Sequence, residues 1–344
     1  MILCLYVDDT LIVFQLSDLD EWKQDLGAIR KVYPIKDLGE CHWILNMKIT
    51  RDWDRGTITL SQEAYVDRIL THFGMMECRP VSTPAQGGNY WKPLPKNHEL
   101  AKPLNKEGVE CYRSAVGALL YAANITRPDI AHTIGRLCRH TAEPNHMDWN
   151  AVKRVFRYLR GTVDHCLIFG RNPRELHLAP DITVYADADW ASDFEDSKST
   201  SGCLVRFNGD VLNWFSKKQH SVALSTNEAE YMALAEAIKE ALWYRSCIQE
   251  ILSVLICPTI YCDNQSAIKL SKNDCIHDKS KHIRIRYHFI RDEAAKKNIV
   301  IKYIPTEKQQ ADMLTKSLDR IVFIRNRESV MVSSVDLDQA ARAL

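Results

Sequence analysis

Apolar and polar positions alternate with clear periods from the first residues of the chain. Two runs typical of β-strands flank Asp8 and Asp9, which predicts a hairpin with an acidic tip. Apolar side chains then recur at helical spacing over 18–33, and extended runs and a second helix follow. These elements form a first predicted unit, residues 1–78, with strands at 44–50 and 57–60 and the second helix at 62–73.

Prolines and glycines interrupt this pattern between residues 79 and 110. Five prolines and three glycines in that segment disfavour a long helix or a central strand, so a linker or an extended surface strap is expected. Helical spacing then returns, which predicts a helical connection over 111–175. The polar faces of its helices are basic, with Arg127, Arg136, Arg139, Lys153, Arg154, Arg157 and Arg160. Two interpretations of these faces are equally open: a solvated surface, or a surface that follows a nucleic-acid duplex.

The most informative pattern lies between residues 182 and 318. Three β-rich runs come first, and Asn208-Gly209 between the second and third is a hairpin signal because both residues tolerate positive φ. Ser225 and Glu228 then form a capping box at the start of a helix. Further strands and helices alternate. The order predicts an α/β (α+β) fold with a mixed five-stranded sheet and flanking helices, with strands at 182–186, 201–207, 211–215, 259–263 and 299–304 and later helices at 265–272, 287–297 and 308–317.

Four carboxylates fall at the edges of these predicted elements. Asp187 ends the first strand, Glu230 lies in the first turn of the following helix, Asp263 ends a later strand, and Asp312 lies on a late helix. Hard cations need oxygen ligands that rigid elements hold close together. The four residues are therefore candidate ligands and catalytic groups of a two-metal phosphodiester site that takes Mg²⁺ or Mn²⁺.

Composition adds few constraints. Apolar residues make up 46% of the chain and the net charge is +1, so a nucleic-acid partner must be argued from local patches. The 11 cysteines form no C-x-x-C pair, which indicates reduced thiols in an intracellular protein. No apolar run approaches the length of a membrane span, so no membrane association is expected.

A basic, histidine-containing run over 277–291 is the strongest local patch. Charged residues alternate with Ile283, Ile285 and Tyr287, which predicts an extended edge segment with one charged side. Zinc is improbable there because the histidines lack the spacing of metal ligands on a helix. The candidate nucleic-acid-binding residues are Lys279, Lys281, His282, Arg284, Arg286, His288 and Arg291.

Short motifs are distributed from residue 1 to about 318. They include Tyr6-Val-Asp-Asp9, Tyr112-Arg-Ser-Ala-Val-Gly117, Thr126-Arg-Pro-Asp-Ile-Ala131, Arg157-Tyr-Leu-Arg-Gly-Thr162, Tyr185-Ala-Asp-Ala-Asp-Trp190, Ser199-Thr-Ser-Gly202, Leu224-Ser-Thr-Asn-Glu-Ala-Glu-Tyr-Met-Ala-Leu234, Asp263-Asn-Gln-Ser-Ala267 and Ala311-Asp-Met-Leu-Thr-Lys316. Any one of these motifs is weak evidence, but their number and order are specific, and together they resemble the Pol polyprotein of copia-type LTR retrotransposons.

The resemblance implies a reverse transcriptase followed by a ribonuclease H domain at 182–318. Asp8 and Asp9 would be the metal-binding pair of the polymerase palm, although an exposed turn is the plain alternative. The ribonuclease H carboxylates would be Asp187, Glu230, Asp263 and Asp312, and the substrate an RNA–DNA hybrid whose RNA strand is cut. The family also implies a cytoplasmic virus-like particle, the nucleus or both as the location.

The chain also departs from the family pattern. The fingers and the first part of the palm would precede Met1, so no autonomous polymerase activity is expected, and the missing Pol portion is a candidate partner. Leu3, Leu5, Leu11 and Val13 would then expose apolar surface. Residues 306–311 contain no histidine where cellular ribonucleases H carry one. The tail, residues 319–344, matches no motif and is expected to be mobile.

Two alternatives stay open at this point. The first is a catalytically inactive retroelement remnant that at most binds nucleic acid. The second is an unrelated α/β binding module that shares only the topology of the sheet. That module would need a glycine-rich loop to hold phosphate, and the sequence contains no such loop.

Overall fold

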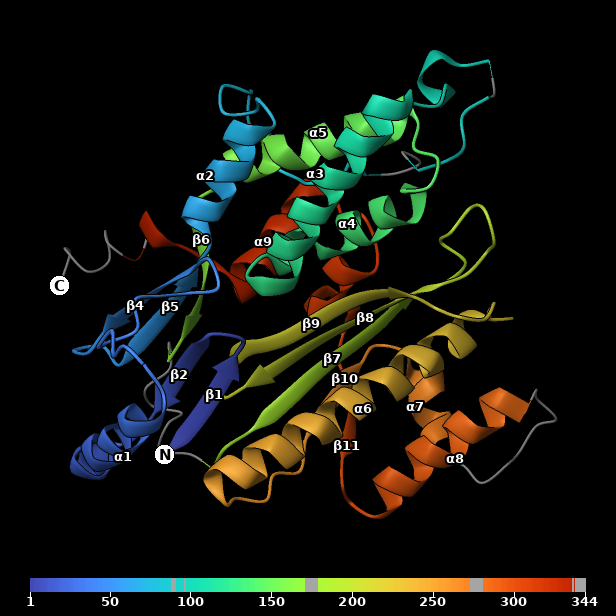
Figure 1. Cartoon of the computed structure of the whole chain (residues 1–344). Coiled ribbons are helices and arrows are strands. Elements are labelled where there is room, and N and C mark those ends of the chain that lie inside the picture. Colours follow the sequence, from blue (N-terminus) through green and yellow to red (C-terminus); the bar gives the residue numbers. More distant parts are fainter. Residues whose placement is uncertain (88–90, 96, 171–178, 273–280, 336, 338–344) are drawn as a thin grey trace.

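The computed structural model describes residues 1–87, 91–95, 97–170, 179–272, 281–335 and 337 (Figure 1). Its central layer is the five-stranded sheet expected for residues 182–318. β8 runs antiparallel to both neighbours, whereas β10 and β11 run parallel to β7. The predicted mixed sheet of a ribonuclease H-like fold is therefore confirmed. The strand order is β11-β10-β7-β8-β9, with β7 (Ile182–Asp189), β8 (Thr200–Phe207), β9 (Asp210–Lys218), β10 (Thr259–Cys262) and β11 (Val300–Tyr303).

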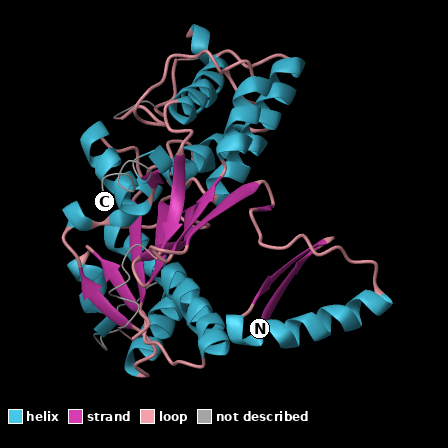
Figure 2. Cartoon of the chain, turned by 90° about the vertical axis from the view of Figure 1, so that its left-hand side faces the viewer, coloured by secondary structure: helices cyan, strands magenta, loops and turns pink. Residues whose placement is uncertain are grey.

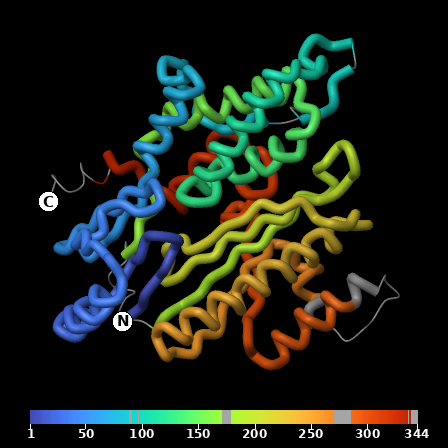
Figure 3. The backbone as a smooth tube through the Cα atoms, viewed as in Figure 1, coloured from blue at the N-terminus to red at the C-terminus, as the bar shows by residue number. Residues whose placement is uncertain are grey.

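Helices cover this sheet on one face, and a second apolar core covers the other. The long helix α6 (Thr226–Leu252) crosses the first face, with α7 (Gln265–Lys272) and α8 (Lys281–Ala295) on the same side (Figures 1 and 3). Ile182 and Val184 of β7 are buried in the core that includes α6. Tyr185, which lies between them and Ala186, packs on the opposite core instead. The period-two pattern of β7 thus places its residues on both faces of the sheet.

Local signals set the turn and the helix start in this domain. Asn208 and Gly209 have φ values of 49° and 85°, as a tight hairpin turn between β8 and β9 requires. The Ser225 side chain accepts a hydrogen bond from the backbone N–H of Glu228 at 3.2 Å. The Glu228 carboxylate accepts one from the N–H of Leu224 at 3.0 Å, one residue before the position that a capping box predicts.

A second five-stranded sheet joins segments that are far apart in the sequence. Leu60 of β5 lies opposite Leu167 of β6, and Val332 of β12 lies opposite Cys166. The sequence pattern predicts neither β6 nor β12. The connection over 111–175, which was expected to be helical, contributes the strand β6 as well. The order is β12-β6-β5-β4-β3, with β3 (Trp43–Ile44), β4 (Met47–Asp52), β5 (Thr57–Ser61), β6 (His165–Phe169) and β12 (Val332–Ser333).

The helices of the connection pack around a core of their own. Leu70, Leu119 and Phe156 are buried together, and Phe323 from beyond residue 319 joins them. The expectation of a mobile tail is therefore wrong for residues 320–333, which form α9 and β12. The helices of this unit are α2 (Glu63–His72), α3 (Lys106–Ile125), α4 (Ala131–Leu137), α5 (His146–Arg160) and α9 (Arg320–Val330).

The amino-terminal hairpin and the helix after it project from the main body (Figure 2). They are β1 (Ile2–Tyr6), β2 (Asp9–Val13) and α1 (Leu19–Val32). Leu3 and Leu5 are 51% and 71% exposed, and Val13 is exposed too, as the sequence predicts, whereas Leu11 is half-buried. Among the described helices, none is long and apolar enough to cross a membrane.

The basic side chains of the connection have a role that neither sequence interpretation includes. Arg157 Nε donates to the carbonyl of Arg79 at 2.8 Å, and Arg160 Nε donates to the carbonyl of Met76 at 2.7 Å. Arg154 binds the Thr83 hydroxyl at 2.8 Å. These contacts fix the strap that follows residue 75 onto α5. Arginine supplies several donors in a rigid geometry, which suits it to hold backbone carbonyls.

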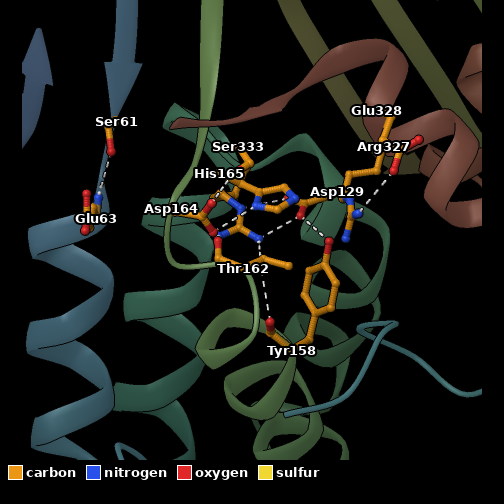
Figure 4. A network of polar contacts seen from close by, with 11 residues as sticks. Ser61, Glu63, Asp129, Tyr158, Thr162, Asp164, His165, Arg327, Glu328 and Ser333 are labelled. Atoms are coloured by element: carbon orange, nitrogen blue, oxygen red, sulfur yellow. Dashed lines mark hydrogen bonds and ion pairs between the residues drawn. The ribbon is translucent and has the colours of Figure 1, made fainter. Parts of the chain in front are cut away.

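A buried ion pair stands where α3, α5 and β6 meet. Arg127 Nε and Nη2 donate to the two oxygens of Asp129 at 3.0 and 2.7 Å, and the Tyr158 hydroxyl donates to Asp129 at 2.5 Å. Arg127 also donates to the Thr162 carbonyl at 2.8 Å. Figure 4 shows Asp129, Tyr158 and Thr162 beside Asp164 and Ser333. Burial disfavours the charged form of Asp129, but the adjacent Arg127 guanidinium outweighs the effect of burial and lowers the pKa of Asp129.

This pair yields a stability prediction. Asp129→Asn leaves the Arg127 charge buried without a counter-charge, so the free energy of unfolding should fall by about 3–5 kcal/mol. Urea unfolding followed by circular dichroism measures the loss. Glu236→Gln is the matched control, because Glu236 pairs with Lys239 on the exposed surface of α6 and such pairs contribute about 1 kcal/mol or less. Equal effects of the two substitutions would contradict a structural role for the buried pair.

Candidate functional site

The structure brings the four predicted carboxylates together at one end of the central sheet. Asp187 lies near the end of β7, Asp263 directly follows β10, Glu230 is in the first turns of α6, and Asp312 is in the 3-10 helix η7 (Gln310–Leu314). Oxygens of Asp187, Asp263 and Asp312 lie within 4.8 Å of one another, and an oxygen of Glu230 lies as close to Asp263. Because β7 and β10 are parallel neighbours, their carboxyl ends deliver both aspartates to the same edge.

The cluster is buried and strongly acidic. Asp187, Glu230 and Asp312 are 2%, 6% and 5% exposed. Burial first, and then the charges of Asp187 and Asp263, raise the pKa of Glu230 well above its usual value. Burial and Asp187 raise the pKa of Asp312 to about 7. Oxygen Oε2 of Glu230 has no hydrogen-bond partner in the part of the chain that the structure describes. A buried carboxylate oxygen of this kind fits a cation.

Donor chemistry favours a hard cation. All four side chains offer carboxylate oxygens, which Mg²⁺ and Mn²⁺ prefer. The Cys262 thiol also lies near Glu230 and Asp263, but burial raises its pKa and thereby disfavours the thiolate that zinc would need. The Thr306 hydroxyl donates to Asp263 Oδ2 at 2.7 Å and orients that carboxylate.

The two acids most easily confused with the predicted set have other surroundings. Glu228 accepts a hydrogen bond from the N–H of Leu224 and so serves the start of α6. Asp189 belongs to neither group of potential metal ligands found among the described residues, although burial raises its pKa. The geometry therefore favours Asp187 and Glu230 over these neighbours.

Two residues of the site escaped the sequence analysis. The Thr315 hydroxyl hydrogen-bonds the Asp187 carboxylate, and Lys316 Nζ lies 2.9 Å from Asp312 Oδ1 and 3.6 Å from Asp187 Oδ2. Both follow Asp312 in one motif, and the spacing of four residues between Asp312 and Lys316 is an available signal. Gln309 Nε2 donates to the Ala186 carbonyl at 2.9 Å and anchors η7 to β7.

A glycine permits η7 to approach the sheet. Gly202 of β8 lies opposite Asp187, and a Cβ at Gly202 would stand 2.6 Å from Thr315 Cγ2 and 3.1 Å from the Ala311 carbonyl oxygen. Backbone and a packed methyl group meet there, so any larger residue must displace η7. The position of Asp312 relative to Asp187 thus depends on the absence of a side chain at residue 202.

The basic run differs from its predicted form. It was expected to be an extended edge segment, but residues 281–295 form the helix α8. Residues two apart lie on different faces of a helix, so the alternation does not create one charged side. Lys279 lies outside the described residues. Lys281, His282 and Arg284 begin α8, His288 is exposed, Arg286 is half-buried, and Arg291 stacks over Tyr287 at 5.9 Å. Nucleic-acid binding by this run stays a prediction.

The Asp8–Asp9 pair lies apart from this cluster in its own element. Both residues are exposed at the tip of the β1–β2 hairpin, where Val7 has a φ of 49°. Among the residues that the structure describes, no group of three potential metal ligands includes either one.

Comparison with known proteins places the chain in a family. Residues 1–87 match the reverse transcriptase (RNA-dependent DNA polymerase) family. The chain is 41% identical over 97% of its length to the retrovirus-related Pol polyprotein from transposon TNT 1-94 of Nicotiana tabacum, and 36% identical over 93% to that from transposon RE2 of Arabidopsis thaliana. It covers 24% and 21% of those proteins. It is also 32% identical to a putative transposon Ty5-1 protein of Saccharomyces cerevisiae, with 69% of this chain and 73% of that protein covered.

Two solved structures show a weaker likeness. LC11-RNase H1 in complex with RNA/DNA hybrid is 19% identical, with 39% of this chain and 94% of that chain covered at a TM-score of 0.31. The foamy viral protease-reverse transcriptase in complex with RNA/DNA hybrid is 12% identical, with 92% and 37% covered at a TM-score of 0.49. The fold assignment rests on the strand order described above.

The fold and the matched family define a reverse-transcriptase-like region followed by a ribonuclease H-like domain. The chain belongs to the Pol polyproteins of copia-type retrotransposons, and it spans about a quarter of the length of the Pol polyproteins matched above.

The contact at Gly202 yields a prediction about the site. Gly202→Ala should weaken the binding of a divalent cation at least tenfold, because η7 and Asp312 must move, although no ligand is changed. Isothermal titration calorimetry with MgCl₂ measures the affinity, and circular dichroism checks the fold.

Gly117→Ala is the control for that substitution. Gly117 lies on the exposed side of α3 with no atom within 4 Å of a new Cβ, so alanine should stabilise the helix by up to about 1 kcal/mol and leave the affinity unchanged. If Gly202→Ala bound Mg²⁺ with wild-type affinity, the close approach of η7 to the sheet would not determine the geometry of the metal site.

Proposed function

We propose that this chain is a metal-dependent endonuclease that hydrolyses the RNA strand of RNA–DNA hybrids. The observation that carries the proposal is the cluster of Asp187, Asp263 and Asp312, whose oxygens lie within 4.8 Å of one another, with Glu230 beside it. Its place at the end of a ribonuclease H-like sheet and the membership of the Pol family support the same activity.

The proposed cofactor is Mg²⁺ or Mn²⁺. Asp187 and Asp263 would both be ligands of the ions. Glu230 would complete the coordination of the first ion, and Asp312 that of the second. When bound, the ions activate a water molecule for attack on the phosphodiester and stabilise the 3′ oxygen that leaves. The protein supplies fixed ligands. The hydroxyls of Thr315 and Thr306 orient Asp187 and Asp263, as outer hydrogen bonds do in metal sites.

The proposed substrate is recognised by shape rather than by sequence. RNA–DNA hybrids present 2′-hydroxyls in a wide, shallow minor groove, and a ribonuclease of this kind needs only these and the phosphates. We place the phosphate contacts on the basic run of α8, and His288 is exposed there. The remaining Pol portion is a proposed partner, and the proposed location is a cytoplasmic virus-like particle, the nucleus or both.

The amino-terminal pair has a separate proposed role. Asp8 and Asp9 would be metal ligands of a polymerase palm, which the family match over residues 1–87 supports. Two carboxylates on one hairpin do not enclose two octahedral ions. We therefore propose no polymerase activity for this chain alone.

Cleavage of a labelled RNA–DNA hybrid tests the proposed function. The wild-type protein should cut the RNA strand with Mg²⁺ and not with a chelator. Asp263→Asn should lower the cleavage rate about 100-fold or more. Changes to residues that only support metal ligands already lower metal affinity or activity about 10–100-fold.

The double variant Asp8→Asn/Asp9→Asn is the matched control. It removes two exposed carboxylates from the same chain and should cut at the wild-type rate. Absence of cutting by a wild-type protein with native circular dichroism would favour the inactive remnant. Unchanged cutting by Asp263→Asn would show that the activity does not come from this cluster.

A further inference from the structure

Lys316 places a positive charge within the acidic cluster that the proposed reaction does not use. Its ammonium lies 2.9 Å from Asp312 Oδ1 and 3.6 Å from Asp187 Oδ2. Among the residues whose side chains the structure describes, no other lysine, arginine or histidine forms an ion pair with Asp187, Glu230, Asp263 or Asp312. Lys316 thus contacts two of the four carboxyl groups, Asp187 and Asp312.

The backbone holds Lys316 at this place. Lys316 follows Asp312 by four residues, and its N–H donates to the Asp312 carbonyl at 3.2 Å. The adjacent Thr315 is fully buried and bound to Asp187. The Lys316 side chain is 34% exposed, so its flexible stem has room to turn toward solvent. The ammonium can therefore enter the cluster or leave it without movement of η7.

The ammonium lies against two of the carboxylates that a metal ion would use. The oxygens it contacts belong to Asp187 and Asp312, which are two members of the group of three that could hold an ion. Two cations repel each other strongly at such distances in a poorly solvated site. A divalent ion bound by these oxygens and the ammonium in its present place are therefore mutually unfavourable.

We propose that Lys316 is an internal counter-cation that balances the cluster in the absence of metal and competes with the metal ion for Asp187 and Asp312. The inference rests on the proposed function, because it takes the cluster to be the metal site. Binding of an ion would release the ammonium toward solvent. Lys316 would thus lower the affinity for metal while it stabilises the metal-free fold.

Calorimetric titration with MgCl₂ tests the competition. Lys316→Met keeps most of the stem and removes the charge, so the protein should bind Mg²⁺ about tenfold more tightly than wild type. Lys316→Arg keeps the charge and should stay near wild type. Lys302→Met is the control, because Lys302 is exposed on β11 and is not a residue of the cluster, so this substitution should not change the affinity. Unchanged or weaker binding in Lys316→Met would overturn the competition.

Thermal unfolding in a chelator tests the balancing role. Lys316→Met should melt at a lower temperature than wild type, because the carboxylates repel each other without a counter-charge. Adding Asp312→Asn to it removes one of these charges and should restore much of the loss. A lost side-chain contact alone would not be repaired in this way. A melting temperature of Lys316→Met equal to wild type, or no recovery in the double variant, would overturn the inference.

The two proposals fail in different ways. If the wild-type protein neither binds Mg²⁺ nor cuts the hybrid, the proposed function is wrong, and the competition is wrong with it. If the wild-type protein binds Mg²⁺ and cuts, but Lys316→Met binds Mg²⁺ no more tightly, only the role of Lys316 is wrong.

Discussion

Mutual repulsion among buried carboxylates is the constraint on which the central domain depends. Asp187, Glu230 and Asp312 are almost fully buried within reach of one another, and burial and neighbouring charge raise the pKa of Glu230 and Asp312. Such groups take up protons unless a cation compensates their charge, and rigid elements must hold them close together. Here β7 and α6 are held by the core on one face of the sheet. The strands and helices hold the carboxylates in place, and the carboxylates in turn require a positive charge that compensates theirs.

The least regular of these elements sets the geometry of the site. η7 has five residues in a 3-10 helix, a form with poorer hydrogen-bond geometry than an α-helix. Its position depends on side-chain and backbone contacts: Gln309 binds the end of β7, Leu314 fills the core on the far face of the sheet, and Gly202 leaves room for Thr315. The neighbouring α9 and β12 continue into the connection and the second sheet. The ribonuclease H-like domain and the connection are thereby joined close to the site.

Features encoded by neighbouring residues could be predicted from the sequence. The Asn208-Gly209 turn, the cap at Ser225 and the apolar alternation of β7 are local signals, and they placed Asp187 and Glu230 on the right elements. β6 and β12 gave no such signal, because their partners lie more than 100 residues away and each strand is short. The alternation in 281–291 suggested an extended segment, but Tyr287 and Ile290 are buried on a helix that packs on α6. The spacing of Lys316 from Asp312 is visible in the sequence, but its contact with Asp187 depends on tertiary structure that spacing alone does not specify.

We propose the cluster as a site for divalent cations. The most direct test is electron paramagnetic resonance of Mn²⁺ mixed with the protein, because free Mn²⁺ gives a strong six-line signal that binding diminishes. We expect about two bound ions per chain. We also expect loss of most of this binding in Asp187→Asn, which removes a ligand from the centre of the sheet. Free Mn²⁺ at every concentration tested, or equal binding by wild type and Asp187→Asn, would contradict the proposal.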